Sequence, residues 1–160
     1  MAKFNFLFLT LLNIGKIKYA PGTFASLFAT LIFLLMINIF AISNIFLFIL
    51  IIFCYSFIAI NNSFGEFNSD DPQEIVIDEF VGQMLPLLAI PIYETLYPIP
   101  KFYYFISAFL LFRLFDIWKP YPVNYIDKNM KGAMGIMLDD IAAGFYAILI
   151  LCILFFFMGG

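Results

Sequence analysis

Long apolar segments separated by short polar connections make up most of this 160-residue chain. Five such segments follow the N-terminal region. Each has 16–18 residues, near the short limit of the roughly 17–25 residues that a membrane helix needs. They cover residues 24–40, 45–60, 80–97, 102–118 and 141–158. The pattern predicts an all-α integral membrane helical bundle with about five membrane segments, in a single domain over residues 1–160.

Two regions need a separate interpretation. Residues 4–14 follow Lys3 as the apolar part of a signal peptide would, but Lys16 and Lys18 stand where a cleavage region usually lacks positive charge. We therefore expect a retained helix there, either interfacial or re-entrant. The segment 80–97 contains two prolines, each of which removes a backbone donor, so a kink is predicted.

The composition supports the membrane interpretation. Hydrophobic residues make up 64% of the chain and charged residues 12%, whereas a soluble domain is nearer half apolar and a quarter charged. The net charge of −3 and the absence of a basic run argue against nucleic-acid binding. The two cysteines lie far apart in apolar runs, without metal or redox spacing. The sequence gives no indication of oligomeric state.

The charges divide unequally between the two ends of the predicted bundle. If the N-terminus is cytoplasmic, every Lys and Arg except Lys101 lies on or near the cytoplasmic side, as the positive-inside rule requires. Every acid except Glu94 lies there too. Short outer loops explain part of this bias, but not why several acids directly abut the apolar segments. The gathered acids are Glu66, Asp70, Asp71, Glu74, Asp78, Glu79, Asp116, Asp127, Asp139 and Asp140.

The first polar stretch at this face is "YAPGTFAS", residues 19–26. Thr23 is predicted to cap the helix that follows, and Ser26 comes three residues later. Two hydroxyls beside the free N–H groups of a helix start suit a phosphate. A plain helix cap is an equally good interpretation of this stretch alone.

Two further stretches place charges at the ends of apolar segments. Asp78 and Glu79 precede residues 80–97; one could be a simple helix cap, but a pair costs more than a cap requires. Arg113 and Asp116 are three residues apart, share a helical face and are followed by Lys119. The alternative for the Arg–Asp pair is mutual neutralisation near lipid.

The fourth stretch, "GAMGIMLDD", brings Asp139 and Asp140 to the last apolar segment. Carboxylates from separate segments at one face form an oxygen-rich site that suits Mg²⁺, and nearby cations indicate an anion, most simply phosphate. The predicted catalytic and metal-binding residues are Asp78, Glu79, Asp116, Asp139 and Asp140. The predicted phosphate-binding residues are Thr23, Ser26, Arg113, Lys119 and Lys128.

Taken together, "APGT" with Ser26, "DPQEIVIDEFVGQ", "FRLFDIWKPYP" and "GAMGIMLDDIAAG" resemble the phosphatidylglycerophosphatase A family over about residues 19–145. The resemblance implies a Mg²⁺-dependent phosphatase of the bacterial inner membrane. Its substrate would be phosphatidylglycerophosphate, converted to phosphatidylglycerol at the cytoplasmic side. By position it adds Asp127 to the site. Ala25 stands where the family commonly has a second glycine, and Lys131-Gly132-Ala133 stands where His-Gly-Gly is common.

The chain has no histidine, which excludes lipid phosphatases that use a histidine nucleophile. The nucleophile is therefore either a metal-activated water, which we favour, or an aspartate. Two other classes remain open. A CDP-alcohol phosphotransferase-like enzyme would carry an aspartate string on one segment, which is missing here. A membrane cation transporter would place its acids at mid-membrane rather than at segment ends.

Overall fold

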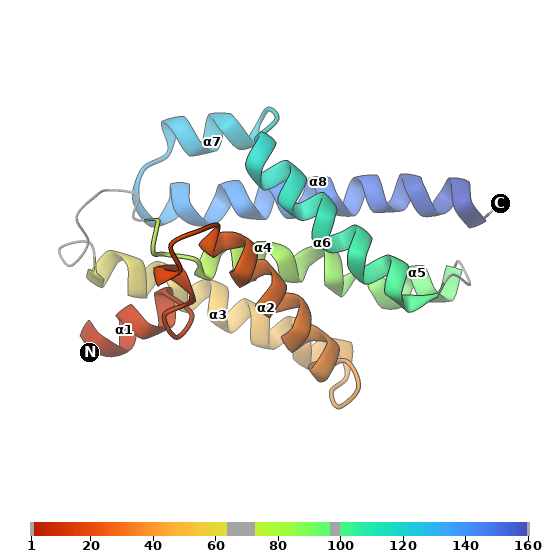
Figure 1. Cartoon of the computed structure of the whole chain (residues 1–160), viewed down its shortest axis with the longest axis horizontal. Helices are drawn as coiled ribbons and strands as arrows, with labels where there is room; N and C mark the ends of the chain where they lie inside the picture. Colours follow the sequence, from red (N-terminus) through yellow and green to blue (C-terminus); the bar gives the residue numbers. More distant parts are fainter. Residues whose placement is uncertain (1, 64–72, 97–99, 160) are drawn as a thin grey trace.

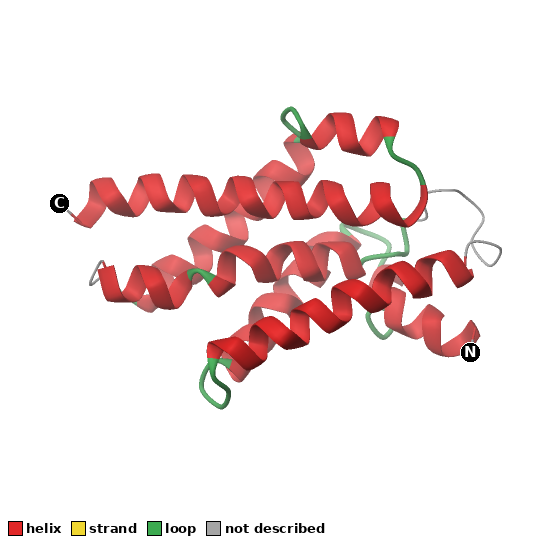
Figure 2. Cartoon of the chain, turned by 180° about the vertical axis from the view of Figure 1, so that it is seen from behind, coloured by secondary structure: helices red, strands yellow, loops and turns green. Residues whose placement is uncertain are grey.

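The computed structural model describes residues 2–63, 73–96 and 100–159. Within these ranges every regular element is a helix and no strand occurs, as Figure 2 shows from behind. The all-α prediction is confirmed. The elements are α1 (Ala2–Leu9), the 3-10 helix η1 (Ile14–Lys16), α2 (Pro21–Met36), α3 (Ile42–Ser63), α4 (Ile77–Leu88), α5 (Ile90–Leu96), α6 (Lys101–Trp118), α7 (Val123–Asn129) and α8 (Gly132–Gly159).

The long helix α8 organises the fold (Figure 1). The helices α4, α6 and α7 pack on it, α2 packs on α4, and α1 packs on α3. The predicted segment 80–97 is interrupted between α4 and α5. Pro91 explains the interruption, because it has no N–H to continue the helical hydrogen bonds.

Two glycines bring the backbones of α4 and α8 close together. A Cβ on Gly82 would lie 2.8 Å from the carbonyl oxygen of Asp140, and a Cβ on Gly144 would lie 2.7 Å from that of Gly82. Only a residue without a side chain permits this approach. The close crossing places the first turn of α4 beside the turn of α8 that carries the two adjacent aspartates.

By length and composition, two helices could cross a bilayer: Ile42–Ser63 and Gly132–Phe157. Only 22% and 33% of their most apolar windows are buried, so most of their apolar side chains face outward. The five predicted segments correspond to α2, α3, α4 with α5, α6, and α8. The five-span bundle therefore remains a prediction.

Two differences from the expected element boundaries stand out. The helix expected over 4–14 ends at Leu9, because Leu11, Leu12 and Asn13 have left-handed φ values of 44°, 56° and 73°. Residues 119–140, which separate the last two predicted apolar segments, contain α7 and the start of α8. Gly132, with φ 69°, permits the turn that starts α8 early.

The early start of α8 changes the setting of two predicted site residues. Asp139 and Asp140 lie inside a regular helix rather than at its entrance. The predicted cytoplasmic acids Glu66, Asp70 and Asp71 lie outside the described residues.

Candidate functional site

A cavity of about 500 Å³ lies at the end of the bundle where α2, α4 and α8 begin and α6 ends. All five predicted carboxylates line it, together with Arg113, Lys119 and Lys128. The cavity is also lined by Asp127. Residues from α2, α4, α6, α7 and α8 therefore meet at one cavity.

Three of the carboxylates form a compact group. One oxygen each from Asp78, Glu79 and Asp140 lies within 4.8 Å of the others. The first two come from the first turn of α4, and the third comes from α8. Gly22 of α2 closes the group from the side, because a Cβ there would overlap Oε1 of Glu79. The group is a candidate site for one cation.

The same three residues each have a buried oxygen without a hydrogen-bond partner: Oδ1 of Asp78, Oε2 of Glu79 and Oδ2 of Asp140. Burial raises the pKa of Asp78 well above its ordinary value, and the charge of Glu79 raises it further. Burial raises the pKa of Glu79 as well. Three carboxyl groups gathered this closely repel one another when they are ionised, and a hard divalent cation relieves that repulsion. The donor set therefore fits Mg²⁺.

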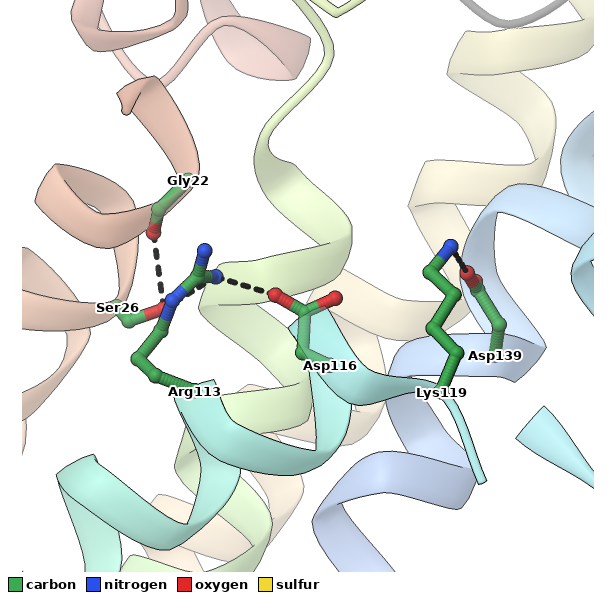
Figure 3. Close-up of polar contacts among 6 residues, drawn as sticks. All are labelled: Gly22, Ser26, Arg113, Asp116, Lys119 and Asp139. Carbon is green, nitrogen blue, oxygen red and sulfur yellow. Dashed lines mark hydrogen bonds and ion pairs between the residues drawn. The ribbon is translucent and has the colours of Figure 1, made fainter. Parts of the chain in front are cut away.

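Arg113 of α6 is held from two sides (Figure 3). Its Nη1 lies 2.5 Å from Oδ2 of Asp116 and 3.4 Å from Oγ of Ser26. The Ser26 hydroxyl donates in turn to the carbonyl oxygen of Gly22 at 2.9 Å. Asp116, predicted as a catalytic and metal-binding residue, pairs with Arg113 and is not one of the three grouped carboxylates.

Lys119 is held between two aspartates. Its Nζ donates to Oδ1 of Asp127 at 2.5 Å and to Oδ2 of Asp139 at 2.8 Å. Burial alone would lower the pKa of Lys119, but these hydrogen bonds outweigh burial and raise it above the ordinary value. Lys119 is therefore a permanent cation. Oδ1 of Asp139 is buried without a partner.

The predicted hydroxyl site on α2 is not part of the cavity wall. The helix begins at Pro21 with Ala20 as its N-cap, so the prediction that Thr23 caps the helix was wrong. Proline is favoured at the first helical position, where its missing N–H costs nothing. Neither Thr23 nor Ser26 lines the cavity, and Ser26 is fully buried.

Sequence reasoning gave no role to two residues that the structure brings forward. Lys131 lines the cavity mouth. Gln83 is fully buried one turn after Glu79, and both atoms of its side-chain amide are without a partner. The position of Gln83 inside the stretch "DEFVGQ" was the available signal.

The three-carboxylate group and two cations, Arg113 and Lys119, line one cavity of this helical bundle, and the side chains of both cations are largely buried. These groups suit a site that binds a phosphate together with a metal ion. Comparison with known proteins agrees. The family model described as phosphatidylglycerophosphatase A matches residues 7–155. The chain belongs to the phosphatidylglycerophosphatase A family and is a phosphatase.

Three curated relatives are similar to the chain. Phosphatidylglycerophosphatase A of Haemophilus influenzae is 32% identical over 136 residues, covering 85% of this chain and 79% of the relative. A putative phosphatidylinositol-3-phosphatase of Bacteroides thetaiotaomicron is 33% identical over 142 residues, covering 87% and 86%. Phosphatidylglycerophosphatase A of Escherichia coli is 40% identical over 74 residues, covering 46% and 39%. No solved structure matches the chain.

Proposed function

We propose that the chain is a Mg²⁺-dependent lipid phosphatase that hydrolyses the terminal phosphomonoester of phosphatidylglycerophosphate to phosphatidylglycerol and phosphate. One observation carries the proposal. The unpartnered oxygens of Asp78, Glu79 and Asp140 share a cavity with two cations, Arg113 and Lys119. Family membership and the printed names of two relatives support the substrate.

Asp78, Glu79 and Asp140 would hold the Mg²⁺ ion. When bound there, Mg²⁺ supplies Lewis acidity toward the phosphoryl oxygens and the attacking water. Asp116 and Asp139 are already paired with cations, so the geometry favours one metal ion over two.

The reacting phosphate would lie between Arg113 and Lys119. Arg113 has a planar fork that suits phosphoryl oxygens, and Lys119 adds a second fixed positive charge. The water oxygen forms the new bond to phosphorus while the bond to the lipid glycerol oxygen breaks, and the leaving oxygen takes up a proton from solvent in the open cavity to give the alcohol. Oδ1 of Asp139, buried and without a partner, would accept the water proton. An aspartate nucleophile is the alternative route.

The membrane location rests on the outward-facing apolar surface and on the charge pattern. The exposed side chains of α3 and α8 include Phe46, Leu47, Phe145 and Leu149. Lipid chains would cover them at no desolvation cost. We propose a multi-pass protein of the bacterial inner membrane, with about five spans and the cavity at the cytoplasmic side.

The test is phosphate release from phosphatidylglycerophosphate by the purified protein in detergent micelles. EDTA should abolish release and added Mg²⁺ should restore it. An Asp78→Asn/Asp140→Asn double variant should remain inactive at every Mg²⁺ concentration, with the Lys16→Gln/Lys18→Gln variant as an active control. Full turnover in excess chelator, with no retained metal by elemental analysis, contradicts the metal mechanism.

A further inference from the structure

The mouth of the cavity carries positive charge that the proposed reaction does not use. Lys128 lies in the last turn of α7, and Lys131 directly precedes α8. Both side chains are exposed and line the cavity. The ion pairs within residues 2–63, 73–96 and 100–159 involve neither lysine.

The start of α8 adds to this positive end. Gly132 and Gly135 line the cavity, so the first turn of a 28-residue helix borders it. The first N–H groups of a helix lack partners within it and carry the positive end of its dipole. A Cβ on Gly135 would overlap the carbonyl oxygen of Met130, so this glycine lets the segment before α8 fold back tightly on its first turn.

The distance along α8 separates this mouth from the carboxylate group. Asp140 lies eight residues after Gly132, about 12 Å along the axis at 1.5 Å per residue. The first turn of α8 and the carboxylate group therefore lie at separate positions along the cavity wall. A cavity of about 500 Å³ falls within the ~300–1,000 Å³ typical of pockets for whole small molecules. The cavity therefore has room and charge for a second anionic group of the same ligand.

We propose that Lys128, Lys131 and the first turn of α8 form a second anion subsite, which binds the phosphodiester of the lipid substrate. This inference rests on the proposed function and deepens it. The enzyme would select lipids that carry a phosphomonoester beyond a phosphodiester, and disfavour lipids with a phosphomonoester alone. Lysine suits the diester, because its compact charge needs no planar partner.

The binding test uses glycerophosphoglycerol, a water-soluble diester without a phosphomonoester, and inorganic phosphate as the second probe. Compared with the parent, Lys128→Gln/Lys131→Gln should bind the diester at least about tenfold more weakly, the loss expected for charge-assisted hydrogen bonds. Its affinity for inorganic phosphate should not change. The Lys16→Gln/Lys18→Gln control removes the same charge from residues that do not line the cavity, and it should bind both probes like the parent.

The kinetic test compares the parent and both double variants on phosphatidylglycerophosphate and on phosphatidate, which lacks the diester. The Lys128/Lys131 variant should show a raised KM for the first lipid with kcat little changed, and no change on the second. The subsite is overturned if the Lys128/Lys131 variant loses the same activity on both lipids, or if both double variants lose the same activity. Either result would mean that the lysines only attract the anionic lipid surface in general. If the parent does not hydrolyse phosphatidylglycerophosphate, the proposed function fails, and the diester-binding comparison still decides the subsite.

Discussion

Asp139 and Asp140 are neighbours in the sequence but face different partners. Oδ2 of Asp139 accepts a hydrogen bond from Nζ of Lys119 at 2.8 Å, whereas Asp140 groups with Asp78 and Glu79. Successive residues of a regular helix point about 100° apart, so one aspartate joins the cation group and the other joins the lysine. The two adjacent carboxylates should therefore fail in different ways when altered.

Asp140→Asn should weaken the metal site. Asn keeps the shape and loses the charge, so the Mg²⁺ concentration for half-maximal activity should rise at least about 10- to 100-fold, the range seen even for residues outside the ligand set. Asp139→Asn should lower kcat strongly and leave the Mg²⁺ dependence near that of the parent. The measurement is phosphate release over a Mg²⁺ titration, together with thermal stability in detergent.

Two outcomes contradict this division of roles. Equal shifts of the Mg²⁺ dependence in both variants would mean that Asp139 also holds the ion. Parent-like activity of both variants at low Mg²⁺ would leave the carboxylates with a structural role only.

Gly22→Ala should disturb the cation site without unfolding the protein. The added Cβ would overlap Oε1 of Glu79 and lie 3.2 Å from Nη1 of Arg113. Because alanine favours helix over glycine by about 1 kcal/mol, stability should change little while activity falls. The matched control is Ala25→Gly on the same helix, which should lose about that much stability and keep its activity. An active Gly22→Ala variant with an unchanged Mg²⁺ dependence would show that Glu79 does not need this position.

Part of the site could be predicted because it depends on local spacing. Arg113 and Asp116 are three residues apart on one helix, and this spacing alone predicts the ion pair that the structure contains. The gathering of acids at one end also follows from their positions at segment ends. These features need no knowledge of how one helix is rotated against another.

The sequence could not predict which carboxylates group together and which pair with cations. That outcome depends on how the helices are rotated against one another and on where α8 begins. The polar residues before Ile141 resembled a loop, yet Gly132 starts the helix early and fixes the directions of Asp139 and Asp140. The exclusion of Ser26 from the cavity likewise depends on the packing of α2 against α4 and α6. Asp127 came from the resemblance, and only the structure shows that it holds Lys119.

The residues at the two ends of the helical bundle predict its membrane topology. Lys128 lies at the cavity end of the bundle, and Pro100 directly precedes α6 at the other. A reporter fused after Lys128 should read cytoplasmic, and one fused after Pro100 should read external. The two reporters are compared at matched expression. If both report the same side, α6 does not cross the membrane and the five-span arrangement is wrong.

The last prediction concerns whether Arg113 binds phosphate or only neutralises Asp116. Arg113→Lys keeps the charge and removes the planar fork, so a phosphate-binding role predicts a folded protein whose activity falls about 30-fold or more. A neutralising role predicts nearly parent-like activity, because lysine can still pair with Asp116. Phosphate release and thermal stability in detergent are measured together, so that loss of folding is recognised.

The double variant Arg113→Leu/Asp116→Leu separates the two roles a second time. It removes both charges at once, so it leaves no unpaired ion near lipid, and replacing a buried pair by apolar side chains is often neutral for stability. If Arg113 only neutralises Asp116, this variant should retain activity and stability together. If Arg113 binds the phosphate, the variant should be as stable as the parent and inactive, and its affinity for inorganic phosphate should fall. If the double variant is active, Arg113 does not bind the phosphate, and Lys119 is the cation that binds it.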